Sequence, residues 1–132
     1  MIAAAGVPVE LVDRVWPDVA AWIDDACRRF DVWTLEEAYA ECQAGRAALW
    51  IALDGSQPVG AAVTQCDGKE AAIALVGGVR ILESIAATLP QIELWASQCG
   101  AKRMAMSGRK GWVRALKPFG YRSEGTLVIK DL

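Results

Sequence analysis

Three apolar stretches between residues 47 and 76, separated by two turn signals, restrict the fold more than any other feature. The stretches cover residues 47–53, 59–66 and 70–76, and each has the length of a strand. Asp54 and Gly55 follow the first stretch, and Asp67 and Gly68 follow the second. An Asp-Gly pair between apolar runs signals a tight turn, and tight turns join antiparallel neighbours. The sequence therefore predicts a three-stranded antiparallel meander.

Helical periodicity precedes the meander. Apolar residues recur at helical spacing over residues 9–30, where Pro17 either kinks the helix or begins a second one. Thr34 and Glu37 have the spacing of a capping box, in which each side chain bonds the backbone N–H of the other residue. This box predicts a short helix that ends near Gly45. Residues 3–7 predict a first strand before both helices.

Alternating helices and strands follow the meander. Gly77 and Gly78 predict a turn into a helix over residues 79–88, which Pro90 breaks or restarts before it continues over 91–99. Residues 102–106 predict a strand, 111–116 a short helix and 126–130 a last strand. The fold class is therefore α+β, with a mixed, mostly antiparallel sheet flanked by helices. Residues 1–132 are predicted to form a single domain.

Histidine is absent from the sequence. This absence excludes Ser-His and Cys-His dyads, histidine-ligated metals and imidazole acid–base catalysis. The four cysteines are dispersed, without a C-x-x-C pair, so no metal site is predicted. The start of the chain lacks a basic segment typical of a signal peptide, and no apolar stretch is long enough for a membrane span. We therefore expect a cytoplasmic protein that has no membrane contact and whose four reduced thiols are buried.

The charges are unevenly distributed along the chain. Acidic residues dominate the first 50 positions, and basic residues dominate residues 101–132. The basic segment either forms a solvated face or faces a phosphorylated ligand. The formal net charge of −2, together with the lack of a known motif, argues against a nucleic-acid-binding module.

The order of elements, together with the C-terminal text, resembles the GNAT acyltransferase family. The text is Met104 to Ser107 followed by Gly111 to Tyr121, in which Gly120 and Tyr121 match the glycine-aromatic pair that opens the family's final strand. The compact size is similar to that of GNAT-like proteins of tailed phages and prophages. The order of elements covers nearly the whole chain, whereas the motif match is confined to the residues after position 100.

The resemblance implies a binding site for acetyl-CoA where the third meander strand meets the following helix. The cofactor's pyrophosphate would bind backbone N–H groups at the N-terminus of that helix, where the helix dipole favours an anion. The matching residues here are Val76, Gly77, Gly78, Val79 and Arg80. In the later loop, Ser107 and Arg109 either hold a second cofactor phosphate or form a polar connector.

The sequence also departs from the family pattern. The phosphate loop is shortened to Gly77 and Gly78, and Leu116 stands where the family often has a tyrosine that protonates the departing thiolate. Glu70 lies at the start of its strand and is interpreted as a turn residue. No catalytic residue is therefore assigned, and any catalysis depends on carboxylates, water and backbone groups.

Two functions are compatible with the sequence. The first is an N-acyltransferase that transfers acetyl from acetyl-CoA to an unknown amine. The second is a GNAT-fold protein without catalysis that serves as a phage or prophage interaction or assembly module with a protein partner. The Gly77 and Gly78 turn supports the first, and the missing tyrosine supports the second.

Overall fold

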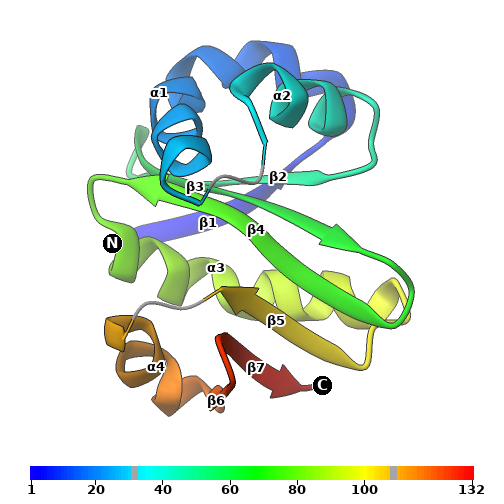
Figure 1. The fold of residues 1–132 in the computed structure, drawn as a ribbon. Helices are drawn as coiled ribbons and strands as arrows, with labels where there is room; N and C mark the ends of the chain where they lie inside the picture. Colours follow the sequence, from blue (N-terminus) through cyan, green and yellow to red (C-terminus); the bar gives the residue numbers. More distant parts are fainter. Residues whose placement is uncertain (31–32, 108–109) are drawn as a thin grey trace.

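The computed structural model describes residues 1–30, 33–107 and 110–132. In this part of the chain the strands form one sheet in the order β1-β2-β3-β4-β5-β7-β6 (Figure 1). Among the described strands, β4 and β5 pair in parallel, and every other neighbouring pair is antiparallel. The strands are β1 (Ile2–Val7), β2 (Ala48–Asp54), β3 (Gln57–Cys66), β4 (Glu70–Gly78), β5 (Arg103–Ser107), β6 (Arg122–Glu124) and β7 (Leu127–Asp131).

Helices cover both faces of the sheet. One apolar cluster combines sheet residues with α1 (Val12–Phe30) and α2 (Leu35–Gln43), and a second combines sheet residues with α3 (Ile81–Gln98). Figure 1 shows α1 and α2 above the strands β2 to β4 and α3 below them, with α4 (Lys110–Leu116) beside the end of β5. Two short 3-10 helices, η1 (Val9–Leu11) and η2 (Lys117–Phe119), connect these elements. The predicted α+β architecture with a central meander β2-β3-β4 is confirmed.

The structure resolves the alternatives at the two prolines. Pro17 lies inside a continuous α1, and Pro90 lies inside a continuous α3. A proline inside a helix removes one hydrogen bond and costs about 3 kcal/mol. Each helix continues because buried residues on both sides of the proline hold it against the sheet, as Val12 and Val19 do in α1. No helix in the described ranges is long and apolar enough to cross a membrane.

The capping box at the start of α2 is confirmed. The backbone N–H of Glu37 donates to Oγ1 of Thr34 at 3.1 Å, and the N–H of Thr34 donates to Oε1 of Glu37 at 3.0 Å. Two N–H groups that the helix cannot satisfy internally thus find acceptors. The Glu37 carboxylate is therefore engaged at the cap.

Two expectations were wrong, and one strand was not predicted. Gly77 and Gly78 do not form a turn; they belong to β4 and pair with Ala61 and Gly60 of β3, so α3 begins only at Ile81. Residues 122–124 form the additional strand β6, which pairs with β7. The four thiols are not all buried: Cys27 and Cys42 are, whereas Cys66 is partly buried and Cys99, at the C-terminal cap of α3, is exposed.

Candidate functional site

The parallel strands β4 and β5 separate toward their carboxyl ends. Their pairing begins at Glu70 and Arg103 and ends at Ile73 and Met106. Beyond Ile73, β4 continues to Gly78 while paired only with β3. The last five residues of β4 therefore have no β5 neighbour. Because β5 ends at Ser107, the edge of β4 beyond Ile73 is unpaired on the β5 side.

A β-bulge in β4 lies where the two strands separate. In the register with β3, Ile73 pairs with Thr64 and Leu75 pairs with Val63, which leaves Ala74 without a partner. Ile73 belongs to the α3-side cluster and Leu75 to the α1-side cluster, although residues two apart in a regular strand share a face. The extra residue causes this change of face and leaves the backbone of Ala74 outside the regular ladder.

The N-terminus of α3 lies directly after the separated end of β4. Arg80 is the N-cap residue, and its side chain makes no capping hydrogen bond. The first bond of the helix runs from the Ser84 N–H to the carbonyl of Arg80 at 2.9 Å. Helix geometry therefore gives the N–H groups of Ile81, Leu82 and Glu83 no acceptor inside the helix. An anion fits this position, because the N–H groups and the helix dipole both favour negative charge.

Two other backbone groups predicted for the phosphate are already engaged. The N–H groups of Val79 and Arg80 donate to the carbonyl oxygen of Val59 on β3, at 3.0 and 3.4 Å. The connection between β4 and α3 is thus only two residues long and is held against the meander. A phosphate at this end of the sheet would bind the first turn of α3 instead of these two groups.

Close packing accounts for both glycines at the end of β4. A Cβ atom at Gly77 would lie 2.7 Å from the carbonyl oxygen of Trp22 in α1. A Cβ atom at Gly78 would lie 2.4 Å from the carbonyl oxygen of Val59, and Gly78 has a φ of 146°. The two glycines therefore let α1 and β3 approach the end of β4. Val76, just before them, is buried against the α3-side cluster.

Carboxylates surround the side chain of Arg80. Its guanidinium donates to Asp54 at 2.5 Å and to Glu83 at 2.6 Å. The hydrogen bond from Arg80 lowers the pKa of both Asp54 and Glu83. All three side chains are more than a third exposed, so water screens these pairs. The one predicted site residue with a cationic side chain in the described ranges is thus neutralised by its neighbours.

The later part of the predicted site is described only in part. Ser107 ends β5, is exposed, and lies opposite Leu127 of β7 in the register. Arg109 lies outside the described residues. Leu116, at the family's tyrosine position, is 1% exposed and belongs to the α3-side core. Its role here is therefore in packing.

Tyr121 does not replace the missing tyrosine. Its hydroxyl donates to Oε2 of Glu93 at 2.7 Å, and Lys130 donates to Oε1 of the same carboxylate at 2.9 Å. Burial, followed by the contact with Glu93, raises the pKa of Tyr121. These contacts attach the end of the chain to α3 and hold the phenol proton in place.

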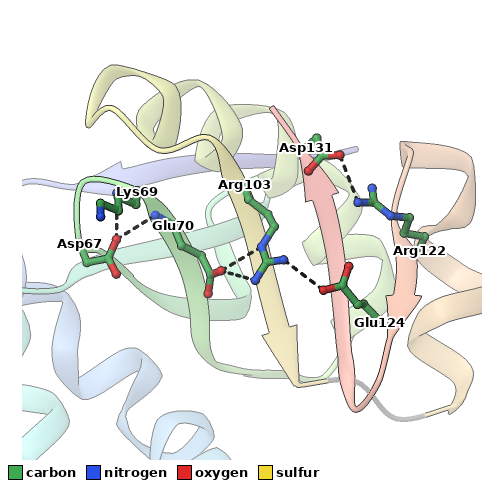
Figure 2. A network of polar contacts seen from close by, with 7 residues as sticks. All are labelled: Asp67, Lys69, Glu70, Arg103, Arg122, Glu124 and Asp131. Carbon is green, nitrogen blue, oxygen red and sulfur yellow. Dashed lines mark hydrogen bonds and ion pairs between the residues drawn. The ribbon is translucent and has the colours of Figure 1, made fainter.

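Ion pairs engage two arginines of the basic C-terminal segment (Figure 2). Arg103 on β5 donates to Glu70 on β4 at 2.5 Å and to Glu124 on β6 at 3.4 Å. Arg122 pairs with Asp131 at 3.1 Å. Glu70 is the first residue of β4 and ties this strand to β5 where the two are still paired, so it is a strand residue and not the turn residue expected from the sequence.

Several solved structures with a similar fold are acetyltransferases. The chain is similar to the ribosomal-protein-S18-alanine N-acetyltransferase of Escherichia coli, with a TM-score of 0.70 and 12% identity over 99% of this chain and 94% of that one. It is also similar to the PaiA N-acetyltransferase of Thermoplasma acidophilum in complex with coenzyme A, with a TM-score of 0.64 and 11% identity over 100% of this chain and 99% of that one. A third similar structure is a GNAT family acetyltransferase of Elizabethkingia anophelis with acetyl-CoA bound, with a TM-score of 0.65 and 11% identity over 99% of this chain and 98% of that one. No protein-family model and no curated protein sequence matches the chain. At these identities the likeness establishes the fold.

Proposed function

We propose that this chain, which has the GNAT fold, binds acetyl-CoA and transfers the acetyl group to an amine. One observation carries the proposal: β4 leaves β5 at a bulge, and the first turn of α3 follows at the same end of the sheet. The backbone of β4 beyond Ile73 is therefore unpaired on the β5 side. It lies next to the N-terminus of α3, whose first N–H groups have no acceptor inside the helix. Similar folds hold coenzyme A or acetyl-CoA in two of the compared structures.

The proposed site uses backbone groups more than side chains. The N–H groups of Ile81, Leu82 and Glu83 would hold the pyrophosphate, and Arg80 would add charge once released from its carboxylates. The edge of β4 over residues 74–78 would lie along the pantetheine arm, with Ser107 across from it on β5. Val76, Gly77, Gly78 and Val79 would thus shape the site through their backbone.

The chemistry at this site would depend on positioning. Acetyl-CoA supplies a thioester whose carbonyl carbon can accept an amine lone pair. We infer that the N–H of Ala74, whose backbone lies outside the regular ladder, would polarise that carbonyl. Residues 74–78 carry no ionisable side chain, so water or a carboxylate from another element would take the amine proton. The C–S bond would break as the C–N bond forms, and the departing thiolate would be protonated from water. The acceptor amine is not specified by these residues.

A specific observation supports the second function, a GNAT-fold protein without catalysis. The carbonyl of Val59 accepts the two N–H groups that precede α3, so they are not free for a phosphate. The carboxylates of Asp54 and Glu83 form ion pairs with the Arg80 side chain. A protein selected only for interaction with a protein partner would tolerate both features. Its phage or prophage origin stays a prediction from the sequence.

A thermal-shift titration with coenzyme A and acetyl-CoA tests cofactor binding. We expect stabilisation of about 2.7 kcal/mol at 100 times Kd. Thiol release from acetyl-CoA in the presence of a panel of amines then tests catalysis. Binding without thiol release would favour the non-catalytic function, and the absence of any shift at millimolar cofactor would refute the enzyme proposal.

Two matched leucines of α3 locate the site. Leu82 lies in the first turn and Leu94 three turns later, and both side chains are more than half exposed, 55% and 61%. Leu82→Glu places a carboxylate beside the proposed pyrophosphate, so we expect coenzyme A affinity to fall at least about fivefold. Leu94→Glu adds the same charge to the same helix and is expected to leave affinity unchanged. Equal effects of the two variants would show that the cofactor binds elsewhere.

A further inference from the structure

Two turns meet at the end of the sheet opposite the N-terminus of α3. One joins β3 to β4, and the other joins α3 to β5; Figure 1 shows both at the right-hand end of the sheet. The N–H of Lys102 donates to the carbonyl of Lys69 at 2.8 Å, which bonds one turn to the other. A Cβ atom at Gly100 would lie 3.5 Å from the carbonyl oxygen of Gly68. The turns are therefore packed together.

Each turn begins with a cysteine. Cys66 is the last residue of β3, and Cys99 is the C-terminal cap of α3. The thiol of Cys66 is directed at the carbonyl oxygen of Cys99, with a sulfur-to-oxygen distance of 4.0 Å. The two side chains are thus neighbours although they are 33 positions apart in the chain.

Both cysteines line one hollow. This hollow has a volume of about 220 Å³, and Arg46 and Trp95 form part of its wall. A second hollow of about 240 Å³ shares Cys66 and Arg46 with the first. A small solute can therefore reach the pair from solvent, in contrast to Cys27 and Cys42, which are buried in the α1-side core.

We propose that Cys66 and Cys99 form a reversible intramolecular disulfide by exchange with a low-molecular-weight disulfide such as oxidised glutathione. The pair is a modification site distinct from the proposed cofactor site, because it lies at the other end of α3. This inference stands independently of the proposed acetyl transfer.

The exchange takes place in two steps. The exposed Cys99 thiolate attacks one sulfur of the small disulfide, whose S–S bond breaks and releases one thiolate. Cys66, deprotonated, then attacks the Cys99 sulfur and releases the second thiolate. The two protein thiols lose two electrons and two protons in total, and the small disulfide becomes two thiols. The cross-link joins the end of β3 to the end of α3.

The wild-type chain provides the first test. After incubation with oxidised glutathione, free thiols measured under denaturing conditions should fall from four to two, with a mass loss of two hydrogen atoms. Peptide mapping should join the peptides that contain Cys66 and Cys99. Loss of hydration and then the neighbouring Cys66 raise the pKa of Cys99, so exchange should be faster at pH 9 than at pH 7.

Single variants distinguish the internal bond from other products. The cross-link restricts the unfolded chain, so oxidation should raise the Tm of the wild type. In Cys66→Ser the reaction should stop at a glutathione adduct on Cys99, and this increase in Tm should be lost. Four free thiols in the oxidised wild type, a stable glutathione adduct on its Cys99 or a dimer linked through Cys99 would each overturn the proposal. The peptide map of the wild type decides even if a variant fails to fold.

Discussion

The guanidinium of Arg80, at the N-terminus of α3, lies 2.5 Å from the carboxylate of Asp54 at the end of β2. This contact directs the one described cation of the proposed phosphate site toward the meander. Asp54→Asn removes the negative charge but keeps an acceptor for the guanidinium. We therefore expect coenzyme A affinity to rise about two- to fivefold, measured by isothermal titration calorimetry at low salt.

Glu124→Gln is the matched control for this prediction. Glu124 pairs with Arg103 at 3.4 Å and is exposed, so its replacement also removes one carboxylate from an arginine. It lies on β6, on the opposite side of β5 from β4. The affinity of this variant for coenzyme A should be close to that of the wild type. A rise in both variants would indicate a general effect of net charge and contradict a local role for Asp54.

Gly78 is predicted to be a structural requirement of the end of β4. An alanine there would place its Cβ 2.4 Å from the Val59 carbonyl at a φ that side chains rarely adopt. We expect Gly78→Ala to lower the free energy of unfolding by more than about 2 kcal/mol, measured by urea denaturation. Gly111→Ala, in open space on α4, should instead be neutral or stabilise by up to about 1 kcal/mol. Equal stabilities of these two variants would contradict the packing assignment.

Local signals were sufficient to predict most of the fold. The turn residues Gly55 and Gly68, both with positive φ, mark the ends of the meander hairpins, and the capping box marks the start of α2. Each of these features depends on residues within a few positions of one another. The extent of the helices around Pro17 and Pro90 depends instead on burial against the sheet, which no local pattern specifies.

For the candidate site, the sequence predicted the region between the end of β4 and the start of α3, but not the contacts made there. The bulge at Ala74 lies within a continuous apolar run, so periodicity gives no signal for it. The bond from Val79 to Val59 and the ion pair from Arg80 to Asp54 join residues 20 and 26 positions apart. Such contacts follow from the register of β2, β3 and β4. The position of Arg109 lies outside the described residues, so its predicted role stays a prediction.

Asp67 in the β3–β4 turn is predicted to make stability depend on pH under acidic conditions. Its carboxylate accepts the N–H groups of Glu70 at 2.8 Å and Lys69 at 2.9 Å, and these bonds lower its pKa below the usual value of an aspartate. The ionised form is therefore favoured in the folded state. Its contribution to stability is complete above pH 4 to 5 and is lost as the pH falls through the lowered pKa.

Urea denaturation of Asp67→Asn at pH 7, 5 and 3 measures this contribution. The amide still accepts an N–H bond but does not titrate, so the difference in stability from the wild type should shrink between pH 5 and 3. Asp67→Ala also removes the acceptor and should be less stable than Asp67→Asn at all three pH values. A difference that stays constant with pH would show that ionisation of Asp67 is not linked to folding.

Ser84 on α3 carries a buried hydroxyl that has no hydrogen-bond partner in the described structure. The helix lies close to β3 at this point: a Cβ atom added at Gly60 would lie 2.5 Å from Oγ of Ser84. Removing an unsatisfied hydroxyl eliminates a desolvation cost. We therefore expect Ser84→Ala to be as stable as the wild type or more stable by up to about 1 kcal/mol, measured by urea denaturation.

The larger Ser84→Val variant separates the effect of polarity from that of space. Valine also lacks the hydroxyl, but its methyl groups would press against the backbone of Gly60. We expect it to lose about 1–3 kcal/mol, the usual range for overpacking. If Ser84→Ala were itself destabilised by more than about 1 kcal/mol, the hydroxyl would have a partner, such as a bound water between α3 and β3. If both variants were neutral, the contact between Ser84 and Gly60 would be looser than the structure shows.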